Sequence, residues 1–460
     1  MRYISTRGTA PALTFEEAML TGLARDGGLY VPETWPRMTA ADIAALAGLP
    51  YEEVAYRVMR PFIGDAFSED EFRAIIERAY AGFGHRLRTP LTQIGESAWE
   101  LELHHGPTLA FKDVAMQLIG QMFEHSLKRR GERVTIVGAT SGDTGSAAIE
   151  AFRGLDAVDV FILYPHGRVS EVQRRQMTTP TEANVHALAV EGDFDDCQAA
   201  VKAMFNDFKF RDAMKLAAVN SINWARVLAQ AVYFFTSAVA LGAPGRKVSF
   251  AVPTGNFGDI FAGYVAKRMG LPIDRLIIAT NQNDILHRTV KSGAHEKRGV
   301  TPSTSPSMDI QVSSNFERLL FDLYDREGQA VAQLMAELTG EGGFTLSQGA
   351  LQRLRDEFSS TRYDEAEVAA LIRQIASDTG HVLCPHSAIG AGAALAADGP
   401  AVALATAHAA KFPDAVEAAC GQRPTLPARM ADLYERDERV TVLPHDLPAI
   451  QAHIRQKARA

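Results

Sequence analysis

Short β-branched runs alternate with helix-like segments over most of this chain, and this alternation restricts the folds that it can adopt. Val134–Val137 leads through a glycine-rich turn into the small-residue segment Ser146–Phe152, and Lys247–Val252 leads in the same way into Ile260–Met269. Further runs of strand type are Val158–Tyr164, Val185–Val190, Arg275–Thr280 and Ala401–Thr406. Strands that alternate with helices favour a mainly parallel sheet with helices on both faces, because parallel neighbours need a crossover connection. The pattern therefore predicts an α/β fold of the doubly wound type.

The N-terminal part of the chain has a different pattern. Apolar residues recur at helical spacing in Phe15–Leu23, Ala40–Ala47, Tyr51–Ile63 and Glu69–Phe83. The length of 460 residues is enough for two or three domains. We expect a mostly helical unit over residues 1–92, an α/β domain over 93–245 and a second α/β domain over 246–460.

Composition and charge exclude several classes of protein. Hydrophobic residues make up 47% and charged residues 22% of the chain, an ordinary balance for a soluble globular protein. The formal net charge of −8 provides no basic surface for nucleic acid or for an anionic membrane. The three cysteines are far apart, which argues against a disulfide framework, and the N-terminus lacks the apolar core of a secretory signal. Because polar residues interrupt the longest apolar stretches, we expect no membrane span and a cytoplasmic location.

Lys112 is the leading candidate for a catalytic residue. It lies in the segment LHHGPTLAFKD (Leu103–Asp113), where Pro107, Leu109 and Phe111 provide apolar surroundings. Desolvation lowers the pKa of a lysine, and only the neutral amine is a nucleophile. Lys112 is therefore a candidate for forming a Schiff base with an aldehyde. A lysine that snorkels from an apolar helix start would give the same local pattern.

Two glycine-rich turns are candidates for binding anions. The first, GATSGDTGS (Gly138–Ser146), places backbone N–H groups at the start of a helix, where a carboxylate or phosphate binds well. Asp143 stands where a P-loop requires lysine, which disfavours ATP or GTP. The second turn is PTGNFGD (Pro253–Asp259), whose glycines allow an anion to approach the backbone closely. Taken alone, the first turn also fits an ordinary connection between a strand and a helix.

The desolvated lysine and the two turns together fit the requirements of pyridoxal phosphate. One turn would bind the cofactor phosphate, the other would bind a substrate carboxylate, and the amine would capture the aldehyde. The ring of this cofactor acts as an electron sink for carbanions.

Longer stretches of the chain resemble the threonine synthase family, whose members are pyridoxal-phosphate enzymes of the tryptophan synthase β-like fold, fold type II. They run from residue 5 to residue 412 and include STRG, LARDGGLYVP, HGPTLAFKD, SGDTGSAA, NSINWARVLAQ, PTGNFGDIFAGY, SPSMDIQVSSNFERLL and TAHAAKF. HGPTLAFKD together with PTGNFGD is specific, whereas SGDTG alone is weak. The resemblance implies two doubly wound, mainly parallel α/β domains with an additional N-terminal helical unit.

The resemblance also implies roles for individual residues. Lys112 is similar to the Schiff-base lysine of the family, and Thr406 is similar to the hydroxyl residue near the pyridine nitrogen. The residues similar to the cofactor-phosphate cradle are Gly255, Asn256, Phe257 and Gly258. The residues similar to the loop that takes the substrate α-carboxylate are Ser141, Gly142, Asp143 and Thr144. Many relatives of the fold carry Asn beside the cofactor 3′-oxygen where this chain has Asp143, and the threonine synthases that it most resembles also carry Asp.

The family converts O-phospho-L-homoserine and water into L-threonine and phosphate by γ-elimination and β-addition, so the resemblance implies a carbon–oxygen lyase of threonine biosynthesis. The freed Lys112 amine is the expected base for the Cα proton and for several later proton transfers. Alternatives are a threonine-synthase-like phospho-lyase that releases 2-oxobutyrate, a dehydratase or racemase of the same fold, and a cofactor-binding protein without catalysis. A monomer and a homodimer are both compatible with the sequence.

The substrate phosphate needs cations or aligned hydrogen-bond donors. The candidates are Ser313, Ser314, Asn315, Arg318 and Lys411. Arg318 fits a helix-surface ion pair equally well, and we expect His105 and His408 to line or brace the site.

Two other features are less informative. His381-x-x-Cys384-x-His386 resembles half of a zinc site, but no second ligand pair follows at a suitable spacing, so we expect no metal. The polar segment Lys291–Pro306 is either a mobile loop near the site or an insertion.

Overall fold

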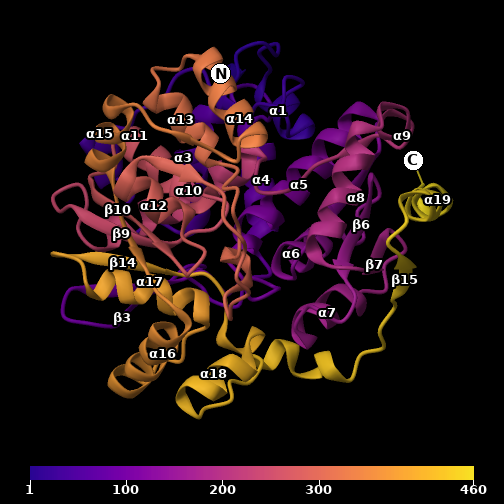
Figure 1. The fold of residues 1–460 in the computed structure, drawn as a ribbon. Coiled ribbons are helices and arrows are strands. Elements are labelled where there is room, and N and C mark those ends of the chain that lie inside the picture. Colours follow the sequence, from indigo (N-terminus) through magenta and orange to yellow (C-terminus); the bar gives the residue numbers. More distant parts are fainter. Residues whose placement is uncertain (460) are drawn as a thin grey trace.

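Two sheets and an N-terminal helical unit make up the molecule, and the computed structural model describes residues 1–459 (Figure 1). The six-stranded sheet has the order β13-β10-β9-β14-β4-β3, and only the pair β3–β4 is antiparallel. Its strands are β3 (Leu91–Gln93), β4 (Ala98–Glu102), β9 (Val248–Pro253), β10 (Ile273–Thr280), β13 (Phe358–Arg362) and β14 (Ala401–Ala405). All residues of β9 and β14 are buried, as expected for central parallel strands covered on both faces.

The five-stranded sheet has the order β15-β7-β6-β5-β8, and all of its pairs are parallel. Its strands are β5 (Val134–Ala139), β6 (Val158–Pro165), β7 (Val185–Glu191), β8 (Leu216–Ala217) and β15 (Thr441–Pro444). The helices α5 (Lys112–Arg130), α6 (Asp143–Phe152), α7 (Glu171–Thr178), α8 (Phe194–Asn206) and α9 (Phe208–Ala213) belong to this half of the molecule, on the right in Figure 1.

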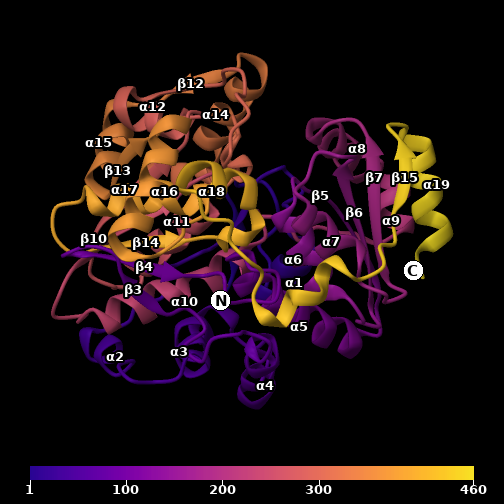
Figure 2. The same cartoon turned by 90° about the horizontal axis from the view of Figure 1, so that it is seen from below.

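The N-terminal unit contains a short antiparallel pair of strands and four helices. The strands are β1 (Tyr3–Ser5) and β2 (Tyr30–Pro32), and the helices are α1 (Phe15–Thr21), α2 (Ala40–Ala44), α3 (Tyr51–Ile63) and α4 (Glu69–Tyr80). Figure 2 shows helices α2, α3 and α4 along the lower edge of the molecule. The unit is tied to the rest of the fold by Glu317, whose carboxylate accepts hydrogen bonds from Thr6 Oγ1 at 2.7 Å and from Arg7 Nε at 3.1 Å.

A buried helix, α10 (Trp224–Ala240), joins these parts. It packs against α3 of the N-terminal unit, α5 of the five-stranded half and α11 (Gly258–Arg268) of the six-stranded half. Trp224 is fully buried and contacts the rings of Tyr3, Trp35 and Phe62. The three units therefore share one main hydrophobic core, which holds α10 and α5 in fixed positions.

The remaining helices cover the six-stranded half and the C-terminal region. They are α12 (Ile285–Ser292), α13 (Phe316–Leu323), α14 (Gly328–Gly340), α15 (Gln348–Glu357), α16 (Glu365–Thr379), α17 (Pro385–Leu395), α18 (Pro413–Cys420) and α19 (Leu447–Lys457), with the 3₁₀ turns η1 (Pro306–Met308), η2 (Ala409–Lys411) and η3 (Ala428–Tyr434). A small antiparallel pair is formed by β11 (Ala294–Glu296), which lies in the polar segment Lys291–Pro306, and β12 (Gly343–Thr345). None of the helices in residues 1–459 combines the length and the apolar character needed to cross a bilayer.

The fold class predicted from the sequence is confirmed, because the protein has mostly parallel sheets and an N-terminal helical region. The division at residues 92 and 245 stays a prediction, and strand pairing crosses it. β4 pairs with β14 in the six-stranded sheet, and β15 pairs with β7 in the five-stranded sheet. After α18 the chain passes through η3 to the opposite half, as the yellow segment in Figure 2 shows. We call residues 421–440 the C-terminal strap.

The return of the C-terminus to the five-stranded sheet is expected to contribute to stability. Ile450 and Ile454 of α19 are fully buried and pack with Cys197, Met204 and Phe210. Ile454→Ala should lower the free energy of unfolding by about 2–5 kcal/mol, because it deletes buried methylene groups and leaves a cavity. Urea unfolding measures this change. Gln456→Ala, at an exposed position of the same helix, is the matched control and should change stability by no more than about 0.5 kcal/mol.

Candidate active site

Lys112 is the first residue of α5, and its position is fixed by contacts with the end of β14. The Phe111 N–H donates to the Thr406 carbonyl at 2.8 Å, and Ala110 forms an isolated antiparallel bridge with Ala407. Leu109 has φ of 64°, a left-handed conformation that turns the chain into the helix. Lys112 is 8% exposed, so the predicted desolvation of its side chain is present.

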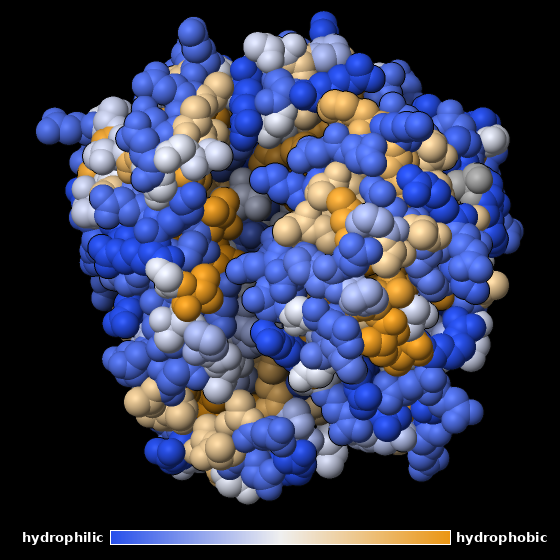
Figure 3. Space-filling view, turned by 45° about the vertical axis from the view of Figure 1, so that its right-hand side comes forward, coloured by the Kyte–Doolittle hydropathy of each residue, from blue (hydrophilic) through white to orange (hydrophobic). Residues whose placement is uncertain are grey.

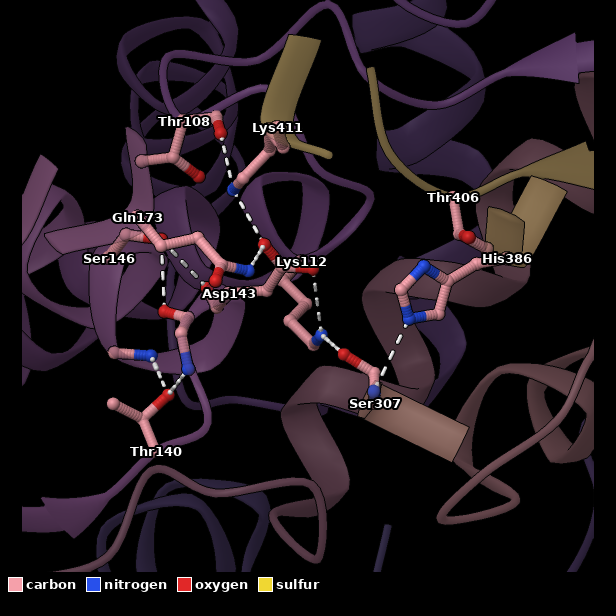
Figure 4. A network of polar contacts seen from close by, with 12 residues as sticks. Thr108, Lys112, Thr140, Asp143, Ser146, Gln173, Ser307, His386, Thr406 and Lys411 are labelled. Carbon is pink, nitrogen blue, oxygen red and sulfur yellow. Dashed lines mark hydrogen bonds and ion pairs between the residues drawn. The ribbon is translucent and has the colours of Figure 1, made fainter. Parts of the chain in front are cut away.

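The Lys112 amine lies between residues from both halves of the molecule (Figure 4). Its Nζ atom is 3.6 Å from Asp143 Oδ2 and 3.4 Å from Ser307 Oγ. Burial lowers the pKa of Lys112, and the nearby cations Lys411 and Arg226 lower it further, while Asp143 acts in the opposite direction. The amine is therefore shifted toward its neutral, nucleophilic form.

The first glycine-rich turn connects β5 to the start of α6. The Thr140 Oγ1 atom accepts hydrogen bonds from the N–H groups of Gly142 at 2.9 Å and Gly145 at 2.8 Å, which fixes the turn. Gly142 has φ of 137°, a conformation that favours glycine. Within residues 1–459 the N–H groups of Ser141, Asp143 and Thr144 have no acceptor, so they remain available to an anion at the helix N-terminus.

The second glycine-rich turn connects β9 to the start of α11 and lies next to Ser307. A Cβ atom at Gly255 would lie 2.5 Å from the Ser307 carbonyl oxygen, so the close approach of the two segments requires glycine. Phe257 has φ of 62° and caps the helix, and its ring packs against Phe316 and Phe358. The N–H groups from Gly255 to Gly258 have no acceptor in the part of the chain that the structure describes. Ser307 thus joins the Lys112 amine to a second anion-receptive turn.

Asp143 and Lys411 form a buried ion pair beside Lys112. The Lys411 Nζ atom is 2.7 Å from Asp143 Oδ1, and it also donates to the Thr108 carbonyl at 2.8 Å. Gln173 Nε2 donates to the same carboxylate oxygen at 2.9 Å. Burial alone would raise the pKa of Asp143, but Lys411, Lys112 and the hydrogen bonds outweigh it and hold this pKa well below its usual range. Asp143 is therefore an anion at neutral pH.

The other residues predicted to bind the substrate phosphate support the second glycine-rich turn and α13. Asn315 donates to the carbonyls of Asn256 and Ser221 at 3.0 Å, and Ser313 Oγ donates to the Gly255 carbonyl at 2.7 Å. Arg318 is fully buried and bonds to the Tyr30 and Ile222 carbonyls and to Asn315. Ser314 is half-buried, and its hydroxyl has no bonded partner within residues 1–459. The substrate-binding roles of these residues stay predictions.

Thr406 and His386 lie on the opposite side of Lys112, in the six-stranded half (Figure 4). The Thr406 N–H donates to Ser387 Oγ at 3.1 Å, and the Thr406 side chain is buried at the end of β14. His386 Nε2 accepts the Ser307 N–H at 3.3 Å, while its Nδ1 is buried without a partner. Burial lowers the pKa of His386 to about 4. The sequence motif around His386 suggested only half of a zinc site, and nothing in its spacing indicated a contact with Ser307.

Arg226 is a second residue that the sequence reasoning did not single out. It lies in the first turn of α10 and is 3% exposed, and its positive charge lowers the pKa of Lys112. Its Nη1 donates to the Val219 carbonyl at 3.3 Å, whereas its Nε is buried without a partner. No carboxylate among residues 1–459 forms an ion pair with it. An arginine in an otherwise apolar helix, WARVLA, was the available signal.

These residues fit pyridoxal phosphate. The N–H groups of Gly255–Gly258 and the start of α11 can hold a phosphate, and Lys112 provides a buried amine for the aldehyde. Thr406 provides a neutral hydroxyl at the end of β14. The face shown in Figure 3 is hollowed by a furrow between two parts of the surface, with apolar side chains along its walls.

Three family descriptions match separate parts of the chain. Residues 2–80 match the family described as threonine synthase N terminus, residues 84–338 match pyridoxal-phosphate dependent enzyme, and residues 387–454 match threonine synthase, C-terminal. Threonine synthase of Pseudomonas aeruginosa is 55% identical, over 99% of this chain and 98% of that protein.

Solved structures agree with this assignment. The crystal structure of threonine synthase from Brucella melitensis with bound pyridoxal phosphate matches with a TM-score of 0.98 at 58% identity, over 100% of both chains. The yeast threonine synthase structure matches with a TM-score of 0.94 at 40% identity, over 99% of this chain and 98% of that one.

A group of titratable side chains lies where the end of β4 continues into the lysine segment. Ligating atoms of Glu102, His104 and His105 lie within 4.8 Å of one another, and this is the one such group in residues 1–459. Both carboxylate oxygens of Glu102 are engaged, one by His105 Nε2 at 2.6 Å and the other by Thr92 Oγ1 at 2.5 Å. The expected absence of a metal stays a prediction. Glu100 on β4 is buried, and burial together with the nearby Glu102 raises its pKa to about 8.

Glu100 should make the stability of the protein depend on pH. In the unfolded chain its pKa is near 4.5, and in the folded protein it is about 8, so folding favours the protonated form. The stability that this group contributes is complete below about pH 4.5 and is lost as the pH rises toward 8. Glu100→Gln should therefore gain stability over the wild type between pH 5 and pH 8, by about 3–5 kcal/mol at the upper end. Urea unfolding at several pH values measures this difference.

Glu96→Gln is the matched control, because Glu96 is exposed in the β3–β4 turn. Its stability difference from the wild type should stay constant over the same pH range. A constant difference for Glu100→Gln would contradict the prediction.

Proposed function

The chain belongs to the threonine synthase family of pyridoxal-phosphate enzymes, and we propose that the pocket around Lys112 converts O-phospho-L-homoserine and water into L-threonine and phosphate. The observation that supports this most directly is the buried Lys112 amine, which lies beside Ser307 and Asp143 and so between two turns with unbonded N–H groups. One turn would hold the cofactor phosphate and the other the substrate carboxylate.

The residues around the cofactor have separate tasks in this proposal. Pyridoxal phosphate, when bound, supplies an electron sink that stabilises negative charge on the neighbouring carbon atoms. The N–H groups of Gly255, Asn256, Phe257 and Gly258 would bind its phosphate. The Thr406 hydroxyl would lie near the pyridine nitrogen, and Asp143 would lie near the 3′-oxygen. A neutral hydroxyl does not enforce a positive charge on the ring nitrogen, so the ring would be a milder electron sink than one paired with a carboxylate.

Lys112 would carry out the proton transfers. The Lys112 amine, when not attached to the cofactor, would be free to accept the proton from Cα. Other bases nearby are engaged: Asp143 is paired with Lys411, and the Asp259 carboxylate accepts a hydrogen bond from Tyr233. We therefore assign to Lys112 the later transfers at Cβ and Cγ as well. These transfers precede the addition of water at Cβ.

The substrate would be oriented at two ends. Its α-carboxylate would accept hydrogen bonds from the loop Ser141–Thr144, whose N–H groups point away from the helix that they begin. Its phosphate would lie near Arg226 and Ser314, because both have groups that no described residue engages. Of the earlier phosphate candidates, Arg318 and Lys411 are engaged by partners inside the protein.

Several broader properties belong to the same proposal. We expect a cytoplasmic enzyme that acts as a monomer or homodimer and binds no nucleic acid, in keeping with the net charge of −8. We keep the division into residues 1–92, 93–245 and 246–460 as functional units, with the strand exchanges described above.

Replacing Lys112 tests the central assignment. Lys112→Ala should abolish the visible absorbance band of the bound cofactor and lower threonine formation from O-phospho-L-homoserine by about 10³-fold or more, since both attachment and proton transfer are lost. Absorbance spectroscopy and an assay of threonine and phosphate measure these effects. A retained band would contradict the assignment. Wild-type enzyme that releases 2-oxobutyrate without threonine would instead identify a phospho-lyase.

Arg226 should act mainly on substrate binding. Arg226→Gln should lower kcat/KM for O-phospho-L-homoserine by about 10–100-fold, because a charge-assisted contact to the phosphate is lost. Steady-state kinetics measure the change, and Arg226→Lys should restore part of it. The visible band of the bound cofactor should persist in both variants. Unchanged kcat/KM in Arg226→Gln would show that this arginine has a structural role only.

A further inference from the structure

One buried carboxylate faces two buried amines in the active site. Asp143 Oδ1 is 2.7 Å from Lys411 Nζ, whereas Asp143 Oδ2 is 3.6 Å from Lys112 Nζ. The side chain of Lys411 is 0% exposed and that of Asp143 is 4% exposed, so solvent screens neither contact effectively. We propose that Lys411 is a positioning residue that occupies the Asp143 carboxylate and thereby keeps the nitrogen of Lys112 uncharged. This inference rests on the proposed role of Lys112.

Charge balance supports the assignment. If both lysines were protonated, two cations would share one buried anion, and an uncompensated buried charge is costly. One amine must therefore release its proton to solvent. The shorter contact assigns the retained proton to Lys411, because attraction between charges increases as the distance falls.

The surroundings hold Lys411 in this position. Its second hydrogen bond goes to the Thr108 carbonyl at 2.8 Å, and Gln176 Nε2 donates to the same carbonyl at 3.0 Å. Thr108 is fixed in turn by Asp113, which accepts from its N–H at 2.8 Å and from its hydroxyl at 2.6 Å. On the other side, Gln173 orients Asp143 (Figure 4). Hydrogen bonds from the surrounding residues therefore hold both Lys411 and Asp143 in place.

No other carboxylate competes for Lys112. Among residues 1–459, Asp143 is the one carboxylate within ion-pair distance of its Nζ. The other charged or titratable groups that interact with Lys112, Asp143 or Lys411 are Arg226 of α10, Asp259 of α11, Asp113 of α5, His408 before η2, and Cys384 and His386 at the start of α17. Asp259 is engaged by Tyr233 and Asp113 by Thr108, so neither carboxylate takes the place of Asp143.

This role differs from the substrate-phosphate role predicted from the sequence. A lysine that binds the phosphate affects the enzyme only when substrate is present. A lysine that occupies Asp143 affects the nitrogen of Lys112 in the absence of substrate. The two roles therefore separate in a measurement on holoenzyme without substrate.

The test is a pH titration of holoenzyme, followed by its visible absorbance. In holoenzyme the Lys112 nitrogen is attached to the cofactor, and the absorbance band changes when this nitrogen loses its proton. Lys411→Met should raise the midpoint of this change by about one to three pH units, because Asp143 then interacts with this nitrogen alone. Lys411→Arg keeps the cation and should leave the midpoint near that of the wild type. The double variant Lys411→Met with Asp143→Asn should reverse the upward shift, since the anion is then absent.

Arg429→Met is the matched control. Its guanidinium also contacts the lysine segment, at the carbonyls of His105 and Gly106, but makes no contact with Asp143. It should leave the midpoint unchanged. If Lys411→Met does not fold, Lys411→Gln removes the charge while keeping a donor for the Thr108 carbonyl, and the same upward shift is expected.

An unchanged midpoint in the folded Lys411 variants, with a raised KM for O-phospho-L-homoserine, would overturn the proposal in favour of phosphate binding. An unchanged midpoint with an unchanged KM would overturn it in favour of a structural role. Because the titration uses no substrate, its result is independent of whether the wild-type enzyme forms threonine.

Discussion

Desolvation of the Lys112 amine is the constraint on which the rest of the site depends. A lysine in water is protonated at neutral pH and cannot attack an aldehyde. The fold removes water from this amine by starting α5 beneath the end of β14, where Phe111 bonds to Thr406. Once the amine is buried, the nearby carboxylate needs a partner of opposite charge, because an unpaired charge in this region would be costly. The ion pair of Asp143 and Lys411 is one result of that requirement.

The sheet topology explains why residues from distant parts of the sequence meet here. The turns after β5 and β9 and Thr406 after β14 all lie at the carboxyl ends of parallel strands, where open α/β sheets bind their ligands. The two sheets contribute one anion-receptive turn each. Ser307, which follows the polar segment Lys291–Pro306, brings the two halves together by contacting both Lys112 and Gly255. The residue directly after that segment therefore belongs to the site, which the composition of the segment did not reveal.

Much of the fold was predictable, because long apolar strands and helical periodicity are local signals. β5, β6, β7, β9, β10 and β14 were all predicted, as were helices α3 and α4. β4 was missed because AWELE is short and contains two carboxylates, and β15 was missed because its alternation is weak and half-exposed. In the site, the burial of Lys112 followed from its neighbours in sequence. The pairing of Lys411 with Asp143 and the location of Arg226 depend on tertiary contacts, which local pattern does not encode.

The elements that follow the C-terminal strap, β15 and α19, have a consequence for how the chain reaches its native state. β15 forms the outer edge of the five-stranded sheet beside β7, and α19 closes the hydrophobic cluster over α8. During synthesis on the ribosome, the strand that completes this sheet emerges last, after the whole six-stranded half. Until then β7 presents an open edge, and exposed strand edges are prone to pairing with other chains. Nascent chains stalled before residue 441 should accordingly be the ones that chaperones need to shield.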